Sequence, residues 1–384
     1  MMKRFTGFFS WVILLAVLFT APASAASSAV YTSDELFTDR DLQQTADLTG
    51  AAQYTVSDGQ DIRITSAGVY VFTGTAGNAT VIVEAGKDDK VQLVLDGVSI
   101  TNADFPAIYV KSADKVFVTV SRDSYLSVTG TFRADGGTNT DGVIFSKVDL
   151  TLNGTATLTI SSTNNGVVSK DDLKITGGTY QINAYSKAVE ANDSIRIAGG
   201  TLNLTAGTDG LHAENEEDAT KGYVYISGGS LTINAGDDGV RGTSVVQIDG
   251  GSLNIRAAEG IEGTYVQING GTISIQASDD GINAARKSGA YTPTIEINDG
   301  DITIVMGAGD TDGIDANGNI IVNGGVIRVT GNSTFDYDGT AQYNGGTIIV
   351  NGQQVSSIPN QMMGGGQGGW GGHGSGGRGG RGGW

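Results

Sequence analysis

Acidic residues return at one position of a short cycle that repeats along the chain. Between residues 208 and 286 the cycle reads TDGLHAEN, DDGVRGTS, EGIEGTYV and DDGINAAR. A cycle without an insertion takes about 21 residues, which indicates an array of one structural unit. When the units are aligned on this turn, the same acidic position is filled by Asp209, Asp238, Glu259, Asp280, Asp312 and Asp338.

Stacking of these units would turn the repeated position into a column of carboxylates. Neighbouring strands of a sheet lie about 4.8 Å apart. Two charges at that distance repel by roughly 3 to 4 kcal/mol at an effective dielectric constant near 20. A column of this kind needs compensation, and calcium suits it because the ion accepts roughly six to eight oxygen ligands with loose geometry.

The potential ligands are densest where acids are doubled on consecutive units. We therefore expect calcium on Asp237-Asp238, on Glu259 with Glu262, and on Asp279-Asp280, next to Asp209 in the same column. A second candidate group consists of Asp310, Asp312, Asp315, Asp336 and Asp338. The alternative is that ordinary Asp-Gly turns and solvent account for the acids.

Basic residues also enter the acidic region and could neutralise part of it. Lys187 stands in the column next to Asp209. The outward row three residues further along alternates in sign, which predicts a salt-bridge ladder of Glu190, His212, Arg241, Glu262, Asn283 and Asp315.

Enzyme chemistry has few candidates in this sequence. The chain contains no Cys and two His, one of them in the C-terminal tail, which argues against thiol catalysis and a His-based triad. Calcium could instead neutralise a uronate while a basic residue abstracts a proton in β-elimination. Lys187, Lys170 and Arg241 are weak candidates for that base, and the simpler role for each is a charge partner.

Short strands must hold these turns in place. From residue 60 onward, Val, Leu and Ile alternate with polar residues, as in half-buried strands. Every unit runs in the same direction, so we expect an all-β fold, a right-handed parallel β-helix (solenoid) of about a dozen coils. Two inward ladders should form in its core, Leu202 with Leu231, Leu253 and Ile273, and Leu204 with Ile233, Ile255 and Ile275.

The outward positions offer candidates for ligand binding. The second strand of the unit presents Lys174, Arg196 and Tyr225, which with His212 are our candidate ligand-binding residues. Polar rows on the third strand could hydrogen-bond a linear glycan or simply face solvent, as in Gln181, Asn203, Thr232, Asn254 and Ser274. Two insertions, residues 212–222 and 285–293, lengthen the same turn and could mark the binding side.

The two ends of the chain differ from the array. Residues 1–25 combine Lys3-Arg4, an apolar run and APASAA, the pattern of a cleaved signal peptide, so we expect a secreted protein without a membrane span after cleavage. Residues 26–59 should form a leader that caps the first coil. Residues 60–360 should form the β-helix, and residues 361–384 a disordered Gly-rich tail. The formal net charge of -18 argues against nucleic acid and anionic membranes as partners.

Several longer motifs together resemble a known family. They are LFTDRDLQQT from Leu36, VQLVLDGVSITN from Val91, PAIYVKSADKVFVTV from Pro106, DGLHA from Asp209, EGIEG from Glu259 and DDGINAA from Asp279. With these motifs the chain resembles secreted bacterial carbohydrate-binding β-helix proteins whose fold is related to that of pectate lyases. The resemblance implies a carbohydrate-binding domain, calcium on acidic turns, and binding of cellulose and acidic plant polysaccharide. The implied calcium residues are Asp209, Asp237, Asp238, Glu259, Glu262, Asp279 and Asp280.

Three functions fit these observations. The first is non-catalytic polysaccharide binding outside the cell by a monomer, assisted by calcium. The second is a calcium-dependent polysaccharide lyase. The third is a surface adhesin or structural solenoid without a specific glycan.

Overall fold

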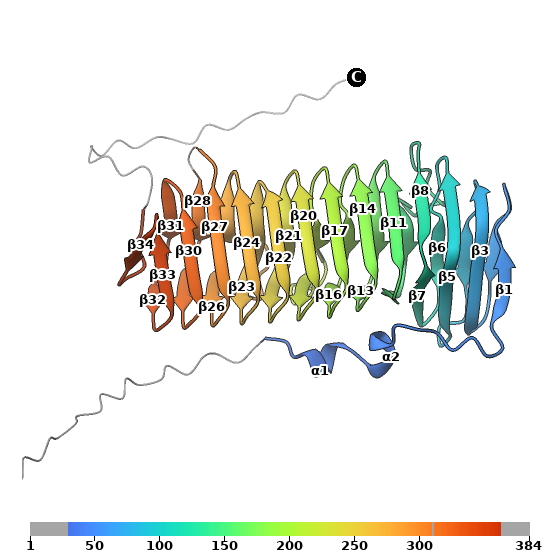
Figure 1. Cartoon of the computed structure of the whole chain (residues 1–384), viewed down its shortest axis with the longest axis horizontal. Coiled ribbons are helices and arrows are strands. Elements are labelled where there is room, and N and C mark those ends of the chain that lie inside the picture. The colour runs from blue at the N-terminus through green and yellow to red at the C-terminus, as the bar shows by residue number, and fades with distance from the viewer. Residues whose placement is uncertain (1–29, 309–310, 362–384) are drawn as a thin grey trace, which may run out of the picture.

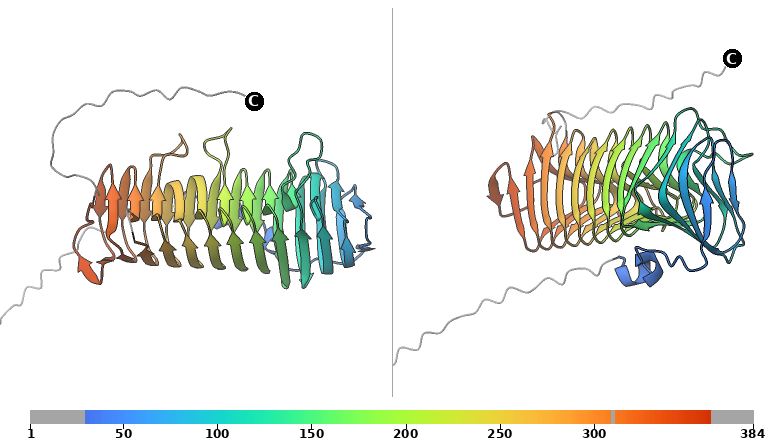
Figure 2. Two further views of the ribbon diagram at one scale, coloured as in Figure 1. Left: turned by 90° about the horizontal axis from the view of Figure 1, so that it is seen from above. Right: turned by 45° about the vertical axis from the view of Figure 1, so that its right-hand side comes forward.

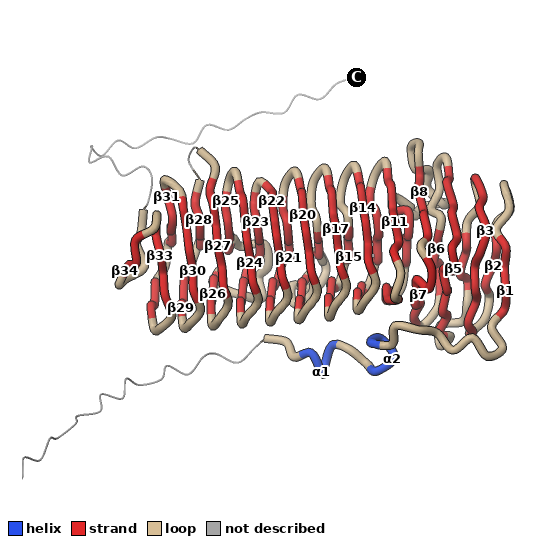
Figure 3. The backbone as a smooth tube through the Cα atoms, in the orientation of Figure 1, coloured by secondary structure: helices blue, strands red, loops and turns tan. Residues whose placement is uncertain are grey.

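The computed structural model describes residues 30–308 and 311–361. The predicted signal peptide, almost all of the predicted tail, and Asp310 lie outside the described residues. The chain winds as a parallel β-solenoid, seen in Figure 1 as a rod with the first coils at one end and the last at the other. Figure 3 shows that strands make up nearly all of the regular structure. No helix in the described part of the chain is long and apolar enough to cross a membrane.

Three columns of strands form the faces A, B and C of the rod, in chain order within each coil. Face A contains β1 (Ala52–Thr55), the first part of β3 (Gly68–Gly77) and of β5 (Lys90–Asn102), β7 (Lys115–Arg122), β10 (Asp149–Gly154), β13 (Asp172–Ile175), β16 (Ser194–Ile197), β19 (Tyr223–Ile226), the last part of β21 (Asp238–Ile248) and of β23 (Glu259–Ile268), β26 (Thr294–Ile297), β29 (Asn319–Val322) and β32 (Ala341–Tyr343). Face B contains the last part of β3 and of β5, β8 (Ser124–Val128), β11 (Thr157–Ser162), β14 (Thr179–Ala184), β17 (Thr201–Ala206), β20 (Ser230–Ala235), β22 (Ser252–Ala257), β24 (Thr272–Ala277), β27 (Asp301–Met306), β30 (Val326–Thr330) and β33 (Thr347–Val350). Face C contains β2 (Ile62–Ile64), β4 (Val81–Glu84), β6 (Ile108–Ser112), β9 (Gly142–Ser146), β12 (Asn165–Ser169), β15 (Val189–Ala191), β18 (Leu211–Ala213), the first part of β21 and of β23, β25 (Asp280–Ala284), β28 (Asp312–Ala316) and β31 (Ser333–Tyr337).

Each strand pairs in parallel with its copy in the next coil, as the repeat predicts. The pairing of the described strands is antiparallel only where β34 (Gln353–Val355) folds back on β33 at the last coil. An all-β fold with a long parallel sheet is thereby confirmed.

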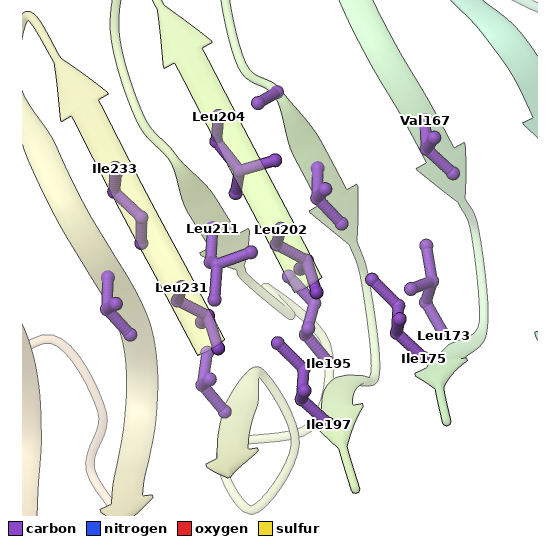
Figure 4. Close-up of a cluster of buried hydrophobic side chains, with 14 of the residues drawn as sticks. Val167, Leu173, Ile175, Ile195, Ile197, Leu202, Leu204, Leu211, Leu231 and Ile233 are labelled. Carbon is purple, nitrogen blue, oxygen red and sulfur yellow. The ribbon is translucent and has the colours of Figure 1, made fainter. Parts of the chain in front are cut away.

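Aliphatic ladders fill the inside of the rod in the predicted register. Leu202 pairs with Leu231, which pairs with Leu253, and the ladder of Leu204 runs beside it. These side chains are at most 1% exposed. Figure 4 shows Leu202 and Leu231 on neighbouring strands facing Leu211, Ile195 and Ile197 from the other two faces. Full burial of one such side chain contributes about 1.5 to 3 kcal/mol, so a long ladder can stabilise a rod that has no disulfide.

Paired glycines turn the chain from face A to face B. In the coils that contain β22 and β24, Gly251 and Gly271 have φ of +95° and +96°. A Cβ built on Gly251 would lie 3.0 Å from the carbonyl oxygen of Gly229 in the preceding coil. Glycine is needed here both for the positive φ and for the close approach of successive coils.

Two units deviate from the predicted alignment. Asp312 pairs with Ser333, so Ser333 takes the column position that we assigned to Asp338, and Asp338 follows β31. Alignment of the units on this turn also sets Asp141-Gly142 against Asn165-Gly166, but Asn165 pairs with Gly142, one residue out of that register. In both units the alternation of buried side chains along the neighbouring strand, and not the position of the Asp-Gly dipeptide, sets the pairing register.

The N-terminal leader lies along the side of the rod. Its helices α1 (Ser33–Leu36) and α2 (Asp39–Leu42) run beside face A in Figure 1, and the turned view of Figure 2 shows the same placement. The ring of Tyr31 stacks on Tyr223 with centroids 4.2 Å apart, and Gln247 exchanges hydrogen bonds of 2.8 and 2.9 Å with the Tyr31 backbone. The prediction that this segment caps the first coil is wrong for residues 30–44, because their apolar and polar partners lie on face A.

Candidate acidic site on face C

The acidic column runs along the edge where the face C strands begin. Carboxylate oxygens of Asp209, Asp237 and Asp238 lie within 4.8 Å of one another, and so do those of Asp238, Glu259 and Glu262. Asp238 belongs to both groups and joins them across consecutive coils. The backbone sets this geometry, because the strand pairings align Asp238 with Glu259, and Arg241 with Glu262.

Burial of these carboxylates makes their charge costly. Asp209 is 3% exposed, and Asp238 and Glu262 are each 2% exposed. Burial, together with the charges of Glu262, Glu259 and Asp209, raises the pKa of Asp238 to about 8. Burial and the charge of Glu262 raise the pKa of Glu259 to about 7. The column therefore holds more negative charge than its immediate surroundings compensate.

Two cations compensate part of this charge. The Arg241 guanidinium lies 3.3 Å from Asp238 and 3.5 Å from Glu262. Lys287, from the second insertion, reaches Glu262 at 2.7 Å. The predicted ladder is thus confirmed in its register and in its pairing of Arg241 with Glu262.

The donor set fits a hard cation such as calcium. The acidic residues would all supply oxygen atoms as ligands, and one further side-chain oxygen lies beside them. The amide of Asn283 donates to Glu259 at 3.0 Å, while its own Oδ1 is buried without a hydrogen-bond partner among the described residues. A buried acceptor of this kind costs free energy unless a donor or a cation meets it. Acidic residues with this geometry could hold a metal ion.

The acids further along the column are less concentrated. Asp280 accepts a hydrogen bond of 3.3 Å from the Asp312 backbone, and Ser333 donates to Asp312. Burial and nearby acids, first among them Asp315, raise the pKa of Asp280 to about 7. Asp279 is exposed. None of the three acidic groups that the described residues bring within ligand distance includes Asp279, Asp280 or Asp312. Of the other acids in the predicted second group, Asp315 pairs with Asp336 in the outward row of face C.

A polar cavity of about 540 Å³ adjoins the column beside the first insertion. Lys170, Lys187, Glu190 and His212 line it. Both lysines pair with Glu190, at 3.3 and 3.6 Å. The imidazole of His212 faces Asp209 at 2.6 Å through Nδ1 and Glu214 at 2.9 Å through Nε2. Burial alone would raise the pKa of Asp209, but the hydrogen bond and charge of His212 hold it below the usual value.

The two predicted insertions lie next to each other. They connect β18 to β19 and β25 to β26, and both leave the rod on one side in the left view of Figure 2. Ser288 of the second insertion donates a hydrogen bond of 2.5 Å to the Ala219 carbonyl of the first. The loops therefore form a continuous wall beside the acidic column.

One acidic group was missed by the sequence analysis. Asp171, Asp172 and Asp193 also bring carboxylate oxygens within 4.8 Å. Asp171 and Asp193 each precede a face A strand on successive coils, and Asp172 begins the first of these strands, so alignment of the repeats would have revealed the group. Lys221 approaches Asp193 at 2.5 Å and Arg196 approaches Asp172 at 2.6 Å, so this group fastens the first insertion to the rod.

Three of the candidate ligand-binding residues lie beneath or beside the leader. Lys174 is 7% exposed and pairs with Asp41 of α2 at 3.0 Å. Tyr225 is 1% exposed, packs against Phe37, and donates to Asp249 at 2.8 Å. Arg196 stacks over Tyr223. The expectation that their row is open to a ligand is incorrect in this structure, because intramolecular partners fill it.

Fold and site together define an acidic parallel β-solenoid with a polar loop wall along one edge. A family model described as "Carbohydrate-binding domain-containing protein" matches residues 58–308 and 261–355, and the chain belongs to this family. This confirms the carbohydrate-binding resemblance seen in the sequence motifs.

One curated relative and one solved structure show what this chain is similar to. A carbohydrate-binding domain-containing protein of Acetivibrio thermocellus is 36% identical over 130 residues, which are 33% of this chain and 46% of that relative. The match thus spans less than half of the relative's length. A solved structure of a polysaccharide lyase-like protein from C. thermocellum, a gadolinium derivative, has 25% sequence identity and a TM-score of 0.44, with 78% of this chain and 94% of that one covered.

Proposed function

We propose that this chain is a non-catalytic polysaccharide-binding protein that works outside the cell with calcium on its acidic turns. Its ligands would be cellulose, acidic plant polysaccharide, or both. Membership of a carbohydrate-binding family supports the ligand class. The observation that carries the calcium part is that two groups of carboxylates share the buried Asp238 and are incompletely neutralised.

In this proposal the ion would be held by Asp209, Asp237, Asp238, Glu259 and Glu262. Calcium would supply positive charge and open coordination positions, since it accepts roughly six to eight oxygens. Asp237 is exposed while its neighbours are buried, so the site has one side toward solvent where a sugar carboxylate or hydroxyl could approach. Arg241 and Lys287 would keep Glu262 oriented, and the ion would supply the rest of the compensation.

The remaining parts of the proposal concern architecture and location. We propose a right-handed solenoid of about a dozen coils, in line with the handedness of nearly all parallel crossovers. The basic and apolar start of the sequence supports secretion. We further propose that the protein acts as a monomer, either free or associated with the cell surface.

A binding experiment with a charge-neutral variant tests the calcium part. Sedimentation with polygalacturonate would be measured with calcium and with chelator for the wild type and for Asp238→Asn/Glu259→Gln. We expect calcium-dependent binding by the wild type and its loss in the variant. Asp88→Asn removes an exposed carboxylate elsewhere and is the matched control. Undiminished binding by the wild type with chelator present, or binding by the variant equal to that of the wild type with calcium, would refute the role of calcium.

A second candidate function is a calcium-dependent lyase, favoured by the position of Lys170 and Lys187 at the cavity next to the acidic column. The simpler role of both lysines is as ion-pair partners of Glu190, which they approach at 3.3 and 3.6 Å. Arg241 is a poor base, because Glu262 and Asp238 raise its pKa despite burial. Appearance of unsaturated uronate products from polygalacturonate, abolished by Lys187→Ala, would favour the lyase.

A third function, adhesion or a structural role, would be favoured by absence of glycan binding under every condition.

A further inference from the structure

The middle coils of face B differ from those of the other two faces because their outward side chains are almost uncharged and are not covered by another segment. We define the face B window as the outward positions of β14, β17, β20, β22 and β24. All these side chains are exposed except Thr179, which is half-buried. The window consists of Thr179, Gln181, Asn183, Thr201, Asn203, Thr205, Ser230, Thr232, Asn234, Ser252, Asn254, Arg256, Thr272, Ser274 and Gln276.

The composition of the window is unlike that of the chain as a whole. Asp and Glu account for 41 of the 384 residues, yet none stands in the window. Its one charged residue is Arg256, and the others are Ser, Thr, Asn and Gln. Just beyond the window, β27 begins with Asp301, which pairs with Arg328. The neutral surface therefore ends at β27 on this side, and it overlaps the coils that carry the acidic groups on face C.

The polar groups of the window are not used within the protein. Across the described residues, no side chain of the window makes a hydrogen bond or an ion pair with another group. Polar rows on the other faces are engaged: Gln247 on face A binds the leader, and Glu262 on face C binds two cations. The window thus presents hydroxyls and amides that can donate and accept hydrogen bonds, on a backbone fixed by parallel pairing.

A shallow groove follows one edge of the window across consecutive coils. It has a volume of about 420 Å³ and is lined by small residues together with Arg256, Gln276, Val305 and Met306. Ala257 and Ala277, one on each of two successive strands, contribute to its lining. The groove runs from coil to coil, so an elongated molecule aligned with the rod could lie in it.

We propose that the face B window is a calcium-independent binding surface for neutral polysaccharide, laid along the rod axis. This proposal takes its ligand class, polysaccharide, from the proposed function. It assigns a second binding site for that class to the protein. Sugar hydroxyls match a face of hydroxyls and amides that both donate and accept. A single hydrogen bond that replaces one to water contributes little to the free energy of binding. A ligand of repeating units is therefore needed, because it can form many such bonds at once.

Other occupants fit these observations less well. A polyuronate or a nucleic acid would meet a single positive charge in the window, that of Arg256. The net charge of -18 on the chain would repel either polymer. A second copy of the chain would find no apolar centre in the window, which stable protein interfaces require. Neutral polysaccharide avoids both difficulties.

Two isosteric substitutions test the assignment. Asn203→Asp/Asn254→Asp places two carboxylates in the middle row of the window without changing side-chain size. Gln53→Glu/Gln342→Glu adds the same charge at exposed positions of β1 and β32, near the two ends of the rod, and is the control. Binding to microcrystalline cellulose and to polygalacturonate would be measured with calcium and with chelator, alongside melting temperature and sedimentation.

We expect the wild type and the control to bind cellulose equally with and without chelator. Asn203→Asp/Asn254→Asp should bind cellulose about tenfold more weakly, with unchanged melting temperature and unchanged calcium-dependent binding of polygalacturonate. Undiminished cellulose binding by this variant, or a wild-type dimer that the variant dissociates, would overturn the assignment. A wild type that binds only polygalacturonate would sink this inference and leave the proposed function standing. Binding of neither polymer would refute both.

Discussion

Replacement of Asp41 by Asn should release the N-terminal leader from face A. The Asp41 carboxylate is 0% exposed and lies 2.5 Å from the Lys115 ammonium and 3.0 Å from that of Lys174. It also accepts a hydrogen bond of 3.0 Å from Thr151. Asparagine keeps the shape and can still accept from Thr151, but it leaves two ammonium groups buried without a counter-charge.

The magnitude follows from the burial of both lysines, which are 9% and 7% exposed. Removing one partner from a buried ion pair costs about 3 to 5 kcal/mol. Detachment of the leader would let both lysines reach water and would relieve this cost. The substitution should therefore favour local opening of the leader over unfolding of the rod. A cost of about 3 kcal/mol corresponds to about a hundredfold shift in the opening equilibrium.

Amide hydrogen exchange of residues 30–44 measures this opening directly. Asp41→Asn should lose protection in this segment while the amides of β17, β20 and β22 keep theirs. Asp39→Asn changes an exposed residue on the same helix and should behave as the wild type. Unchanged protection of residues 30–44 in Asp41→Asn would show that the aromatic contacts alone hold the leader, against our reasoning.

Acid should reproduce the effect of the Asp41 substitution. Burial opposes ionisation of Asp41, but the hydrogen bonds from Lys115 and Thr38 and the charges of both lysines hold its pKa well below its usual range. A depressed pKa in the folded state contributes stability that is fully present above the unfolded pKa, about 3.9, and is lost as pH falls through the folded value. Leader protection should therefore persist at neutral and mildly acidic pH and disappear only in strong acid.

Three further predictions concern the rod. Leu253→Ala should cost about 2 to 5 kcal/mol in unfolding free energy, measured by denaturant titration, because the neighbouring coils can close the cavity only partly. Gly251→Ala should lower the melting temperature, because it forces a side chain into φ of +95° and 3.0 Å from a backbone oxygen; Gly289→Ala, whose Cβ would meet no atom within 4 Å, should not. Calcium should raise the melting temperature of the wild type and chelator reverse it, and Asp238→Asn should diminish this response.

The period of the sequence was sufficient to predict the rod and its core. The spacing between Leu202, Leu231 and Leu253 fixes which residues stack, because a shift by one would turn each ladder outward. The same alignment predicted that Asp238 meets Glu259 and that Arg241 meets Glu262. Residues that repeat can be placed from the sequence because each copy constrains the next.

Residues outside the repeat could not be placed in this way. The leader has no copy, so nothing in the sequence indicated that Asp41 would lie between Lys115 and Lys174. Lys287 reaches Glu262 from an insertion, whose path no period determines. For the same reason the outward row of face A was interpreted as open, although Tyr31 and Phe37 cover Tyr223 and Tyr225.

The three faces of the rod therefore differ in the chemistry of their outward side chains. The cations and aromatic rings of face A are used by the leader, and the acids of face C form a column that demands positive charge. The window on face B instead presents a continuous exposed row of polar side chains that make no hydrogen bond with other described residues. Because the coils are rigidly paired, a polymer held by the acidic column on face C cannot also reach the centre of face B without wrapping around the rod. Under the two proposals made above, the surfaces should bind separate chains, and the protein would link an acidic polysaccharide to a neutral one.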